Sequence, residues 1–196
     1  MSVFYLIRHG TNDLVGHTLA GWMAGVHLNM EGQNQARVLA ERLAQVHFSR
    51  IISSPLERAM ETALPLAKAQ GVQIQSDAMF GEVQFGDWTG RTVKELSSDP
   101  AWIQWNKFRS AARIPNGESM LEVQTRAVNG IIKLHREFPD ETIGIVSHGD
   151  VIRAMLLHVL GMPLDFIHRI EIIPASWSIL NLYDDSAQVF SINERV

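Results

Sequence analysis

Hydrophobic and polar positions along the chain predict strands and helices that follow one another. Positions 3–7 form an apolar run rich in β-branched and aromatic residues, which predicts a buried strand. From 31 to 46 apolar residues recur at i, i+3, i+4 and i+7, which predicts an amphipathic helix packed on a sheet. A second strand is expected at 50–53. The next helix is expected to begin at Ser54, with Pro55 in its first turn, and to end near Gly71.

The second half of the chain continues this alternation after an irregular segment. Residues 76–117 contain scattered glycines, prolines and tryptophans, which predicts loops and short helices forming a small lid insertion over the sheet. A capping box at Ser119 predicts a helix to about Phe138, followed by a strand at 142–147 and a helix at 151–160. A closing hairpin is expected at 176–183 and 188–192. We therefore expect one α/β domain over residues 1–196, with three layers: a mostly parallel sheet and helices on both of its faces.

Composition limits the classes of function. The chain has 196 residues, 46% of them hydrophobic, and its apolar runs are too short to cross a bilayer. A net charge of −4 argues against a general nucleic-acid-binding surface, and the N-terminus lacks the basic start of a signal peptide. The absence of cysteine excludes a cysteine nucleophile. We expect a cytoplasmic protein with a small-molecule partner, no nucleic acid and no membrane; the sequence leaves a homodimer open.

Chemically informative residues gather at three predicted strand-to-helix junctions. These are Arg8-His9-Gly10, the segment 53–58 with Arg58, and the segment 147–150 with His148. Sites in open α/β sheets form beyond the carboxyl ends of strands, so the three junctions can converge. Two arginines and a helix N-terminus suit a phosphate dianion, because guanidinium groups and backbone N–H groups both bind its oxygens. A histidine held against the phosphorus can attack it.

These junctions also carry a resemblance to a known family. The ordered series of motifs resembles that of the histidine phosphatase superfamily, with the phosphoglycerate mutase-like fold, and within it a small group of probable phosphatases. The motifs are LIRHGT at 6–11, SSPLERA at 53–59, GEVQFGDWTG at 81–90, GES at 117–119 and SHGD at 147–150. A single motif of this kind is weak evidence, but five in the family's order cover most of the chain.

The resemblance implies a role for each matching position. We expect no cofactor and no metal ion, since no His-x-x-x-His or equivalent ligand pair occurs on one predicted helix. His9 would be the phosphorylated nucleophile, and Glu82 would protonate the leaving oxygen and then activate water. His148 would complete the catalytic set. Substrate binding would fall to Arg8, Arg58, Asn12 and Gly149. Asn12 is assigned because many relatives have an asparagine at the position that is Val15 here, and Asn12 would take its place from a differently shaped loop.

The predicted function is therefore hydrolysis of a small phosphorylated metabolite, a phosphomonoester, through a phosphohistidine. One alternative is a phosphoglycerate mutase that uses the same residues, disfavoured by the short insertion between Glu82 and Pro115. The other is an inactive binding or regulatory module, disfavoured because such a module has no use for a general acid.

Overall fold

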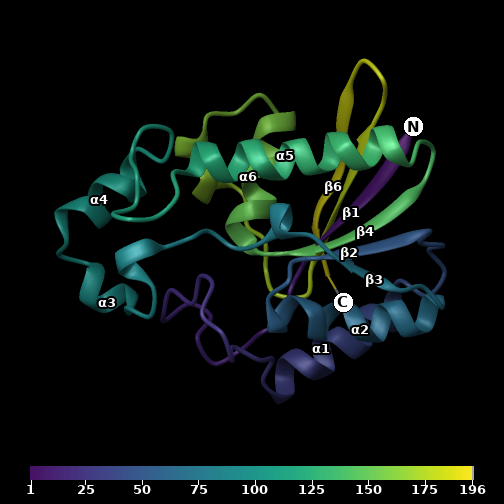
Figure 1. The fold of residues 1–196 in the computed structure, drawn as a ribbon, viewed down its shortest axis with the longest axis horizontal. Coiled ribbons are helices and arrows are strands. Elements are labelled where there is room, and N and C mark those ends of the chain that lie inside the picture. Colours follow the sequence, from purple (N-terminus) through teal and green to yellow (C-terminus); the bar gives the residue numbers. More distant parts are fainter. Residues whose placement is uncertain (196) are drawn as a thin grey trace.

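The computed structural model describes residues 1–195, which fold around a six-stranded sheet (Figure 1). The strand order is β3-β2-β4-β1-β5-β6. Strands β1 to β4 pair in parallel, whereas β5 runs antiparallel to β1, and β6 runs antiparallel to β5. The predicted mostly parallel sheet is thus confirmed. The strands are β1 (Ser2–Arg8), β2 (Arg50–Ser53), β3 (Ile74–Ser76), β4 (Thr142–Ser147), β5 (Trp177–Leu182) and β6 (Ala187–Glu194).

The central strands are apolar because both faces of the sheet are covered. Five of the six residues of β4 are buried, as expected for a parallel strand between two layers of helices. In β1, Phe4 and Leu6 belong to one core and Ile7 to the other, since successive side chains point to opposite faces. The ends of these strands are therefore held in fixed positions.

Four longer helices cover the sheet, two on each face (Figure 1). Helices α1 (Met30–Arg42) and α2 (Glu57–Gln70) lie on one face, and α5 (Met120–Glu137) and α6 (Gly149–Val159) on the other. Helix α5 buries Val123, Ala127, Ile131 and Leu134, which are three or four residues apart and form a single stripe. The predicted three-layer arrangement is confirmed.

The segment between β3 and α5 forms short helices, as expected. These are the 3-10 helices η1 (Ala78–Phe80) and η2 (Gly86–Trp88) and the α-helices α3 (Val93–Leu96) and α4 (Pro100–Lys107). Trp88 and Trp105 are fully buried with ring centroids 5.6 Å apart, and they join the core that underlies α5 and α6. The tryptophans thus anchor this segment to the sheet. A further 3-10 helix, η3 (Leu164–Arg169), follows α6.

One local expectation was wrong, and one strand was missed. Helix α2 begins at Glu57 and not at Ser54: its N-cap is Leu56, which makes no side-chain capping bond. Ser54 is instead used in a tertiary hydrogen bond to His148, described below. The short strand β3 was not predicted, because three residues of which two are exposed give no periodic signal. Across residues 1–195, every helix is too short or too polar to cross a bilayer.

Candidate active site

The three predicted junctions meet at one edge of the sheet. His9 follows β1, Ser54 follows β2 and His148 follows β4, and these three strands are neighbours that run in parallel. The rings of His9 and His148 have centroids 5.1 Å apart and planes inclined by 60°. The structure therefore brings together the residues that the sequence placed far apart.

His9 is held in the orientation of a nitrogen nucleophile. Its Nδ1 lies 2.7 Å from the carbonyl oxygen of Gly10, which can only accept, so the ring proton is on Nδ1 and Nε2 carries a free lone pair. Burial, the charge of Arg58 and the charge of Arg8 lower the pKa of His9 to about 3. The imidazole is consequently neutral and nucleophilic near pH 7.

Glycine at position 10 lets the loop after β1 approach helix α1. A Cβ on Gly10 would lie 2.7 Å from the backbone oxygen of Gly32, a distance that side-chain carbons do not tolerate. The Gly10 amide donates to the hydroxyl of Thr62 on α2 at 2.9 Å. Helices α1 and α2 thus fix the backbone beside His9.

Buried nitrogen atoms without partners surround His9. Arg8 donates from Nη1 to the carbonyl of Ile172, and Arg58 donates from Nη2 to that of Gly21. Within residues 1–195, Arg8 Nε, Arg58 Nη1 and His148 Nδ1 are buried and lack a hydrogen-bond partner. Unpaired buried polar atoms are rare in folded proteins and call for an acceptor. The oxygens of a phosphate group match such a set of donors.

His148 is anchored through the opposite nitrogen. Its Nε2 lies 2.8 Å from Ser54 Oγ, and the Ser54 oxygen also accepts from the Leu56 amide, which leaves the hydroxyl proton for His148. Burial, above all, and the nearby His9 and Arg58 lower the pKa of His148 well below its ordinary value. A neutral His148 that accepts at Nε2 carries its proton on Nδ1, which has no hydrogen-bond partner among the described residues.

Glu82 has the features of a general acid. Its Oε2 lies 3.6 Å from His148 Nδ1, and its Oε1 accepts from the Val83 amide. Burial raises the pKa of Glu82, while the charge of Arg58 acts in the opposite direction. The Glu82 carbonyl accepts from Arg126 at 3.0 Å and from the indole of Trp22 at 2.6 Å. The carboxyl group therefore sits on a backbone segment held from two sides.

A cavity of about 330 Å³ opens onto Arg8, His9, Arg58 and Glu82. His148 and Gly149 are not among its lining residues. Asn12 lines it, with Oδ1 accepting from the Leu14 amide, and Val15 lines it as well. Gly149 stands behind Arg8: a Cβ there would lie 3.3 Å from the Arg8 guanidinium carbon. The full set of residues that line the cavity is Arg8, His9, Asn12, Leu14, Val15, Gly16, Thr18, Leu19, Ala20, Gly21, Arg58, Glu82, Phe85, Val93, Asp150, Arg153 and His168.

The same three catalytic candidates form a potential metal-ligand set. One donor atom from each of His9, Glu82 and His148 lies within 4.8 Å of the others. Two histidines and a carboxylate suit a divalent ion, but the adjacent guanidinium groups of Arg8 and Arg58 repel a cation. The unpaired donors around the cavity match an anion better.

Arg109, Arg153 and His168 were missed in the sequence, and they form a network with Asp150 of the SHGD motif. Asp150 receives ion pairs from Arg109 at 3.1 Å and from Arg153 at 2.9 Å, and His168 lies 3.3 Å from Arg109. The spacing of Asp150 and Arg153 at i and i+3 in one helix was the available signal. Glu118, from the GES motif, is bound by Arg126 and does not line the cavity.

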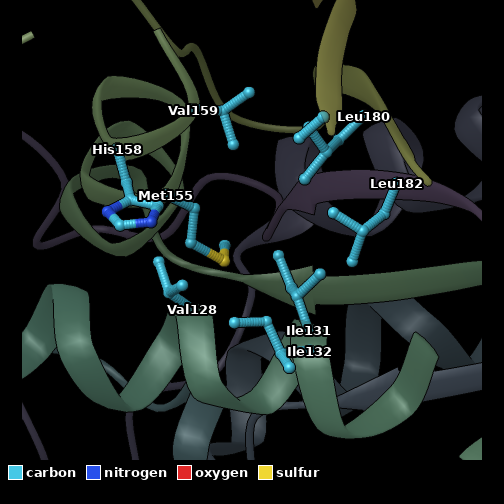
Figure 2. A pocket seen from close by; sticks show the side chains of 9 residues that line it. Val128, Ile131, Ile132, Met155, His158, Val159, Leu180 and Leu182 are labelled. Carbon is cyan, nitrogen blue, oxygen red and sulfur yellow. The ribbon is translucent and has the colours of Figure 1, made fainter. Parts of the chain in front are cut away.

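A second hollow lies away from these residues, between α5, α6 and strands β5 and β6 (Figure 2). It has a volume of about 270 Å³. All of its lining residues except His158 are apolar, so it offers none of the charged groups that phosphate chemistry needs. The residues that line this hollow are Val128, Ile131, Ile132, Met155, His158, Val159, Leu180, Leu182 and Ala187.

The fold and the histidine-arginine pocket define an α/β protein built to bind a phosphate group, and comparison with known proteins agrees. The family model of the histidine phosphatase superfamily (branch 1) matches residues 4–195, and the chain belongs to that family. It is 27% identical to phosphoserine phosphatase 1 of Hydrogenobacter thermophilus, over 96% of this chain and 90% of that protein. It is 29% identical to a probable phosphoglycerate mutase of Serratia proteamaculans, over 81% and 75% of the two chains. The solved structure of YhfR from Bacillus stearothermophilus superposes with a TM-score of 0.93, at 26% identity, over 100% of this chain and 98% of that one.

Proposed function

We propose that the chain hydrolyses a small phosphomonoester through a phosphohistidine at His9. The observation that carries this proposal is the neutral imidazole, with Nε2 free, set among the unpaired donors of Arg8, Arg58 and His148. Phosphoryl transfer depends mainly on positioning and charge neutralisation, and these residues supply both. The family membership supports the same chemistry.

In the first step, His9 Nε2 attacks phosphorus while the bond to the ester oxygen breaks. Arg8, Arg58 and the Nδ1–H of His148 bind the phosphoryl oxygens. Glu82, protonated because burial raises its pKa, gives its proton to the departing alcohol oxygen. The products of this step are the free alcohol, phospho-His9 and an ionised Glu82.

In the second step, a water molecule attacks the phosphorus of phospho-His9. The Glu82 carboxylate takes a proton from that water, the nitrogen-phosphorus bond breaks, and inorganic phosphate leaves. His9 returns to its neutral form and Glu82 to its protonated form. One carboxyl group thus acts as acid and then as base, which requires it to stand beside the reacting oxygen in both steps.

The proposed substrate is a small phosphorylated metabolite, in keeping with a cavity of about 330 Å³. A relative named phosphoserine phosphatase favours hydrolysis, and a relative named probable phosphoglycerate mutase keeps the mutase as the second candidate. The sequence-based expectations of a cytoplasmic location and of no binding of nucleic acid stay predictions, and the sequence leaves a homodimer open.

Assays of the purified protein with a chromogenic aryl phosphate and a panel of metabolite phosphates test this proposal. We expect release of inorganic phosphate, undiminished by EDTA, and no release by His9→Ala. In the presence of phosphoglycerate, the phosphoryl group should still pass to water. Preferential transfer to phosphoglycerate would make the chain a mutase, and reversible loss of activity with EDTA would make it a metalloenzyme.

A further inference from the structure

One side of the cavity carries charge that the phosphate mechanism does not use. Beyond Arg8, the wall continues with Asp150 and Arg153 from α6 and His168 from η3. We name these three residues, with the buried Arg109 behind them, the distal rim. The lining also includes the apolar side chains of Leu14, Leu19 and Val93.

The distal rim stands next to the phosphate pocket. A Cβ built on Gly149 would lie 3.3 Å from the Arg8 guanidinium carbon and 3.6 Å from Arg153 Nη1. The two guanidinium groups therefore flank the same glycine and are near neighbours. A short leaving group, a few carbon atoms long, can reach from a phosphate on Arg8 to Arg153.

The charges of the cavity leave a surplus at the distal rim. Arg8 and Arg58 together match the two negative charges of a phosphate dianion. Arg109 and Arg153 share the single carboxylate of Asp150, at 3.1 and 2.9 Å, so one positive charge remains. Glu171 also pairs with Arg153, at 3.2 Å, but its side chain is 68% exposed, and solvent weakens such a pair.

Arg153 is held rigidly and keeps hydrogens to donate. Its Nε donates to the Ile170 carbonyl at 2.8 Å, Nη1 donates to Asp150 and Nη2 to Glu171. A guanidinium has five N–H groups, so each terminal nitrogen retains one. Three hydrogen bonds fix the plane of the guanidinium and leave two N–H groups free to donate. A guanidinium held in this way is preorganised to bind an anion.

His168 adds a neutral donor beside Arg153. Its Nε2 lies 3.3 Å from Arg109 Nη2, and because a guanidinium only donates, Nε2 is the acceptor. The ring proton of the neutral histidine is then on Nδ1. Partial burial and the charge of Arg109 lower the pKa of His168, which keeps the ring in this neutral form.

We infer that the distal rim binds a carboxylate on the leaving group, so that the preferred substrate is a phosphomonoester of a short hydroxy acid. Arg153 and His168 would contact the carboxylate, and Asp150 and Arg109 would position Arg153 and His168. The inference rests on the proposed function and narrows its substrate class. A neutral leaving group would leave the extra charge of the rim unmatched.

Two esters that differ at one group test the inference: 3-phosphoglycerate, with a carboxylate, and glycerol 3-phosphate, with a hydroxymethyl group in its place. We expect His9→Ala, which does not turn over, to bind 3-phosphoglycerate at least about tenfold more tightly in calorimetric titrations, the scale of a charged hydrogen bond. Adding Arg153→Gln should weaken that binding about 10- to 100-fold and change binding of glycerol 3-phosphate less than about threefold. Inorganic phosphate should bind both proteins equally.

Two further variants keep the test decisive. Adding His168→Ala to the His9→Ala protein should weaken binding of 3-phosphoglycerate by about three- to tenfold, the effect of one neutral hydrogen bond. Binding of glycerol 3-phosphate should be unchanged. The matched control is Arg169→Gln, which lies on η3 like His168 and has its guanidinium stacked on Phe166. This variant should change the binding of neither ester. Equal binding of the two esters, or equal losses for both in Arg153→Gln, would overturn the inference. Because these are binding measurements, they stand even where the aryl phosphate assay shows no hydrolysis, a result that contradicts the proposed function alone.

Discussion

His9 and His148 show how hydrogen bonds assign different tasks to the same side chain. His9 donates from Nδ1 to the Gly10 carbonyl and keeps a lone pair on Nε2, whereas His148 accepts the Ser54 hydroxyl at Nε2 and keeps a proton on Nδ1. Each ring is thus fixed by one nitrogen, and the other nitrogen carries the lone pair of His9 or the proton of His148. Burial lowers the pKa of both, so both are neutral near pH 7. In the proposed mechanism, the lone pair of His9 attacks phosphorus and the proton of His148 binds the phosphoryl group.

Glu82→Gln separates the acid role of Glu82 from the attack by His9. With an alkyl phosphate, whose leaving oxygen needs a proton, we expect turnover to fall about 10²- to 10⁴-fold. With an aryl phosphate, the first step should suffer much less because the phenolate leaves unaided. Rapid mixing should then show a burst of phenolate followed by slow turnover, since the residue that activates water is missing. Equal losses for both esters without a burst would assign the acid role to another residue.

The sequence motifs predicted which residues form the candidate site, but they did not predict the charged residues that surround it. The sequence places Arg8, His9, Arg58 and Glu82 in family motifs, and the structure brings them into one cavity. The network of Arg109, Asp150 and His168 joins positions 41 and 59 residues apart in sequence, and only the tertiary fold creates such contacts. Burial acts to raise the pKa of Asp150, but the ion pairs with Arg109 and Arg153 lower it to about 2, so Asp150 is ionised near pH 7 and is not a proton donor.

Helix α5 positions the segment that carries Glu82. From this helix, Arg126 donates to the carbonyls of Met79 at 2.7 Å and Glu82 at 3.0 Å, and it pairs with Glu118 at 2.9 Å. The capping box of Ser119 and Glu122 begins the helix at the adjacent turn. The helix therefore sets the backbone of Glu82, the proposed acid, although Arg126 itself does not line the cavity.

Arg126→Met should loosen this support without touching the substrate. We expect kcat for an alkyl phosphate to fall about tenfold or more, because misplacement of the acid weakens proton transfer. For an aryl phosphate, kcat should fall far less. Binding of inorganic phosphate should be unchanged. Arg113→Gln removes an exposed arginine that pairs with Glu122 and is the control. Similar losses of kcat with both esters would indicate a general structural role for Arg126.

Element boundaries were predictable where local signals were complete. The capping box at Ser119 marked the start of α5 correctly, and the αL glycine Gly71 marked the end of α2. The serine-proline pair at 54–55 misled, because a serine that bonds a distant histidine looks the same in sequence as an N-cap. Local patterns thus identify elements well and tertiary hydrogen bonds poorly.

The whole molecule keeps uncharged histidines inside a packed site, and this affects stability in acid. The folded protein holds the pKa of His9 at about 3, below its ordinary value of 6.5, so the unfolded chain takes up the proton first as the pH falls. Stability is therefore fully present above pH 6.5 and is lost as the pH falls toward 3. At pH 5, this single group lowers the free energy of unfolding by about 2 kcal/mol relative to pH 7.

His9→Asn should remove this sensitivity. Denaturant unfolding at pH 7 and pH 5 should show a smaller loss of stability in the variant than in the wild type, by about 2 kcal/mol. His47→Asn, at an exposed position, is the control and should retain the wild-type difference. The same acid sensitivity in His9→Asn and wild type would mean that His9 is not held neutral by the fold.

Trapping the phosphoenzyme tests the central claim most directly. Glu82→Gln should be mixed with an aryl phosphate, quenched in base because phosphohistidine is labile in acid, and digested for mass spectrometry. We predict one phosphoryl group per molecule on the peptide that contains His9, matching the burst of phenolate, and none when His9→Ala is added. Phosphate on another residue, or hydrolysis with no phosphoenzyme at any time after mixing, would contradict a phosphohistidine mechanism at His9.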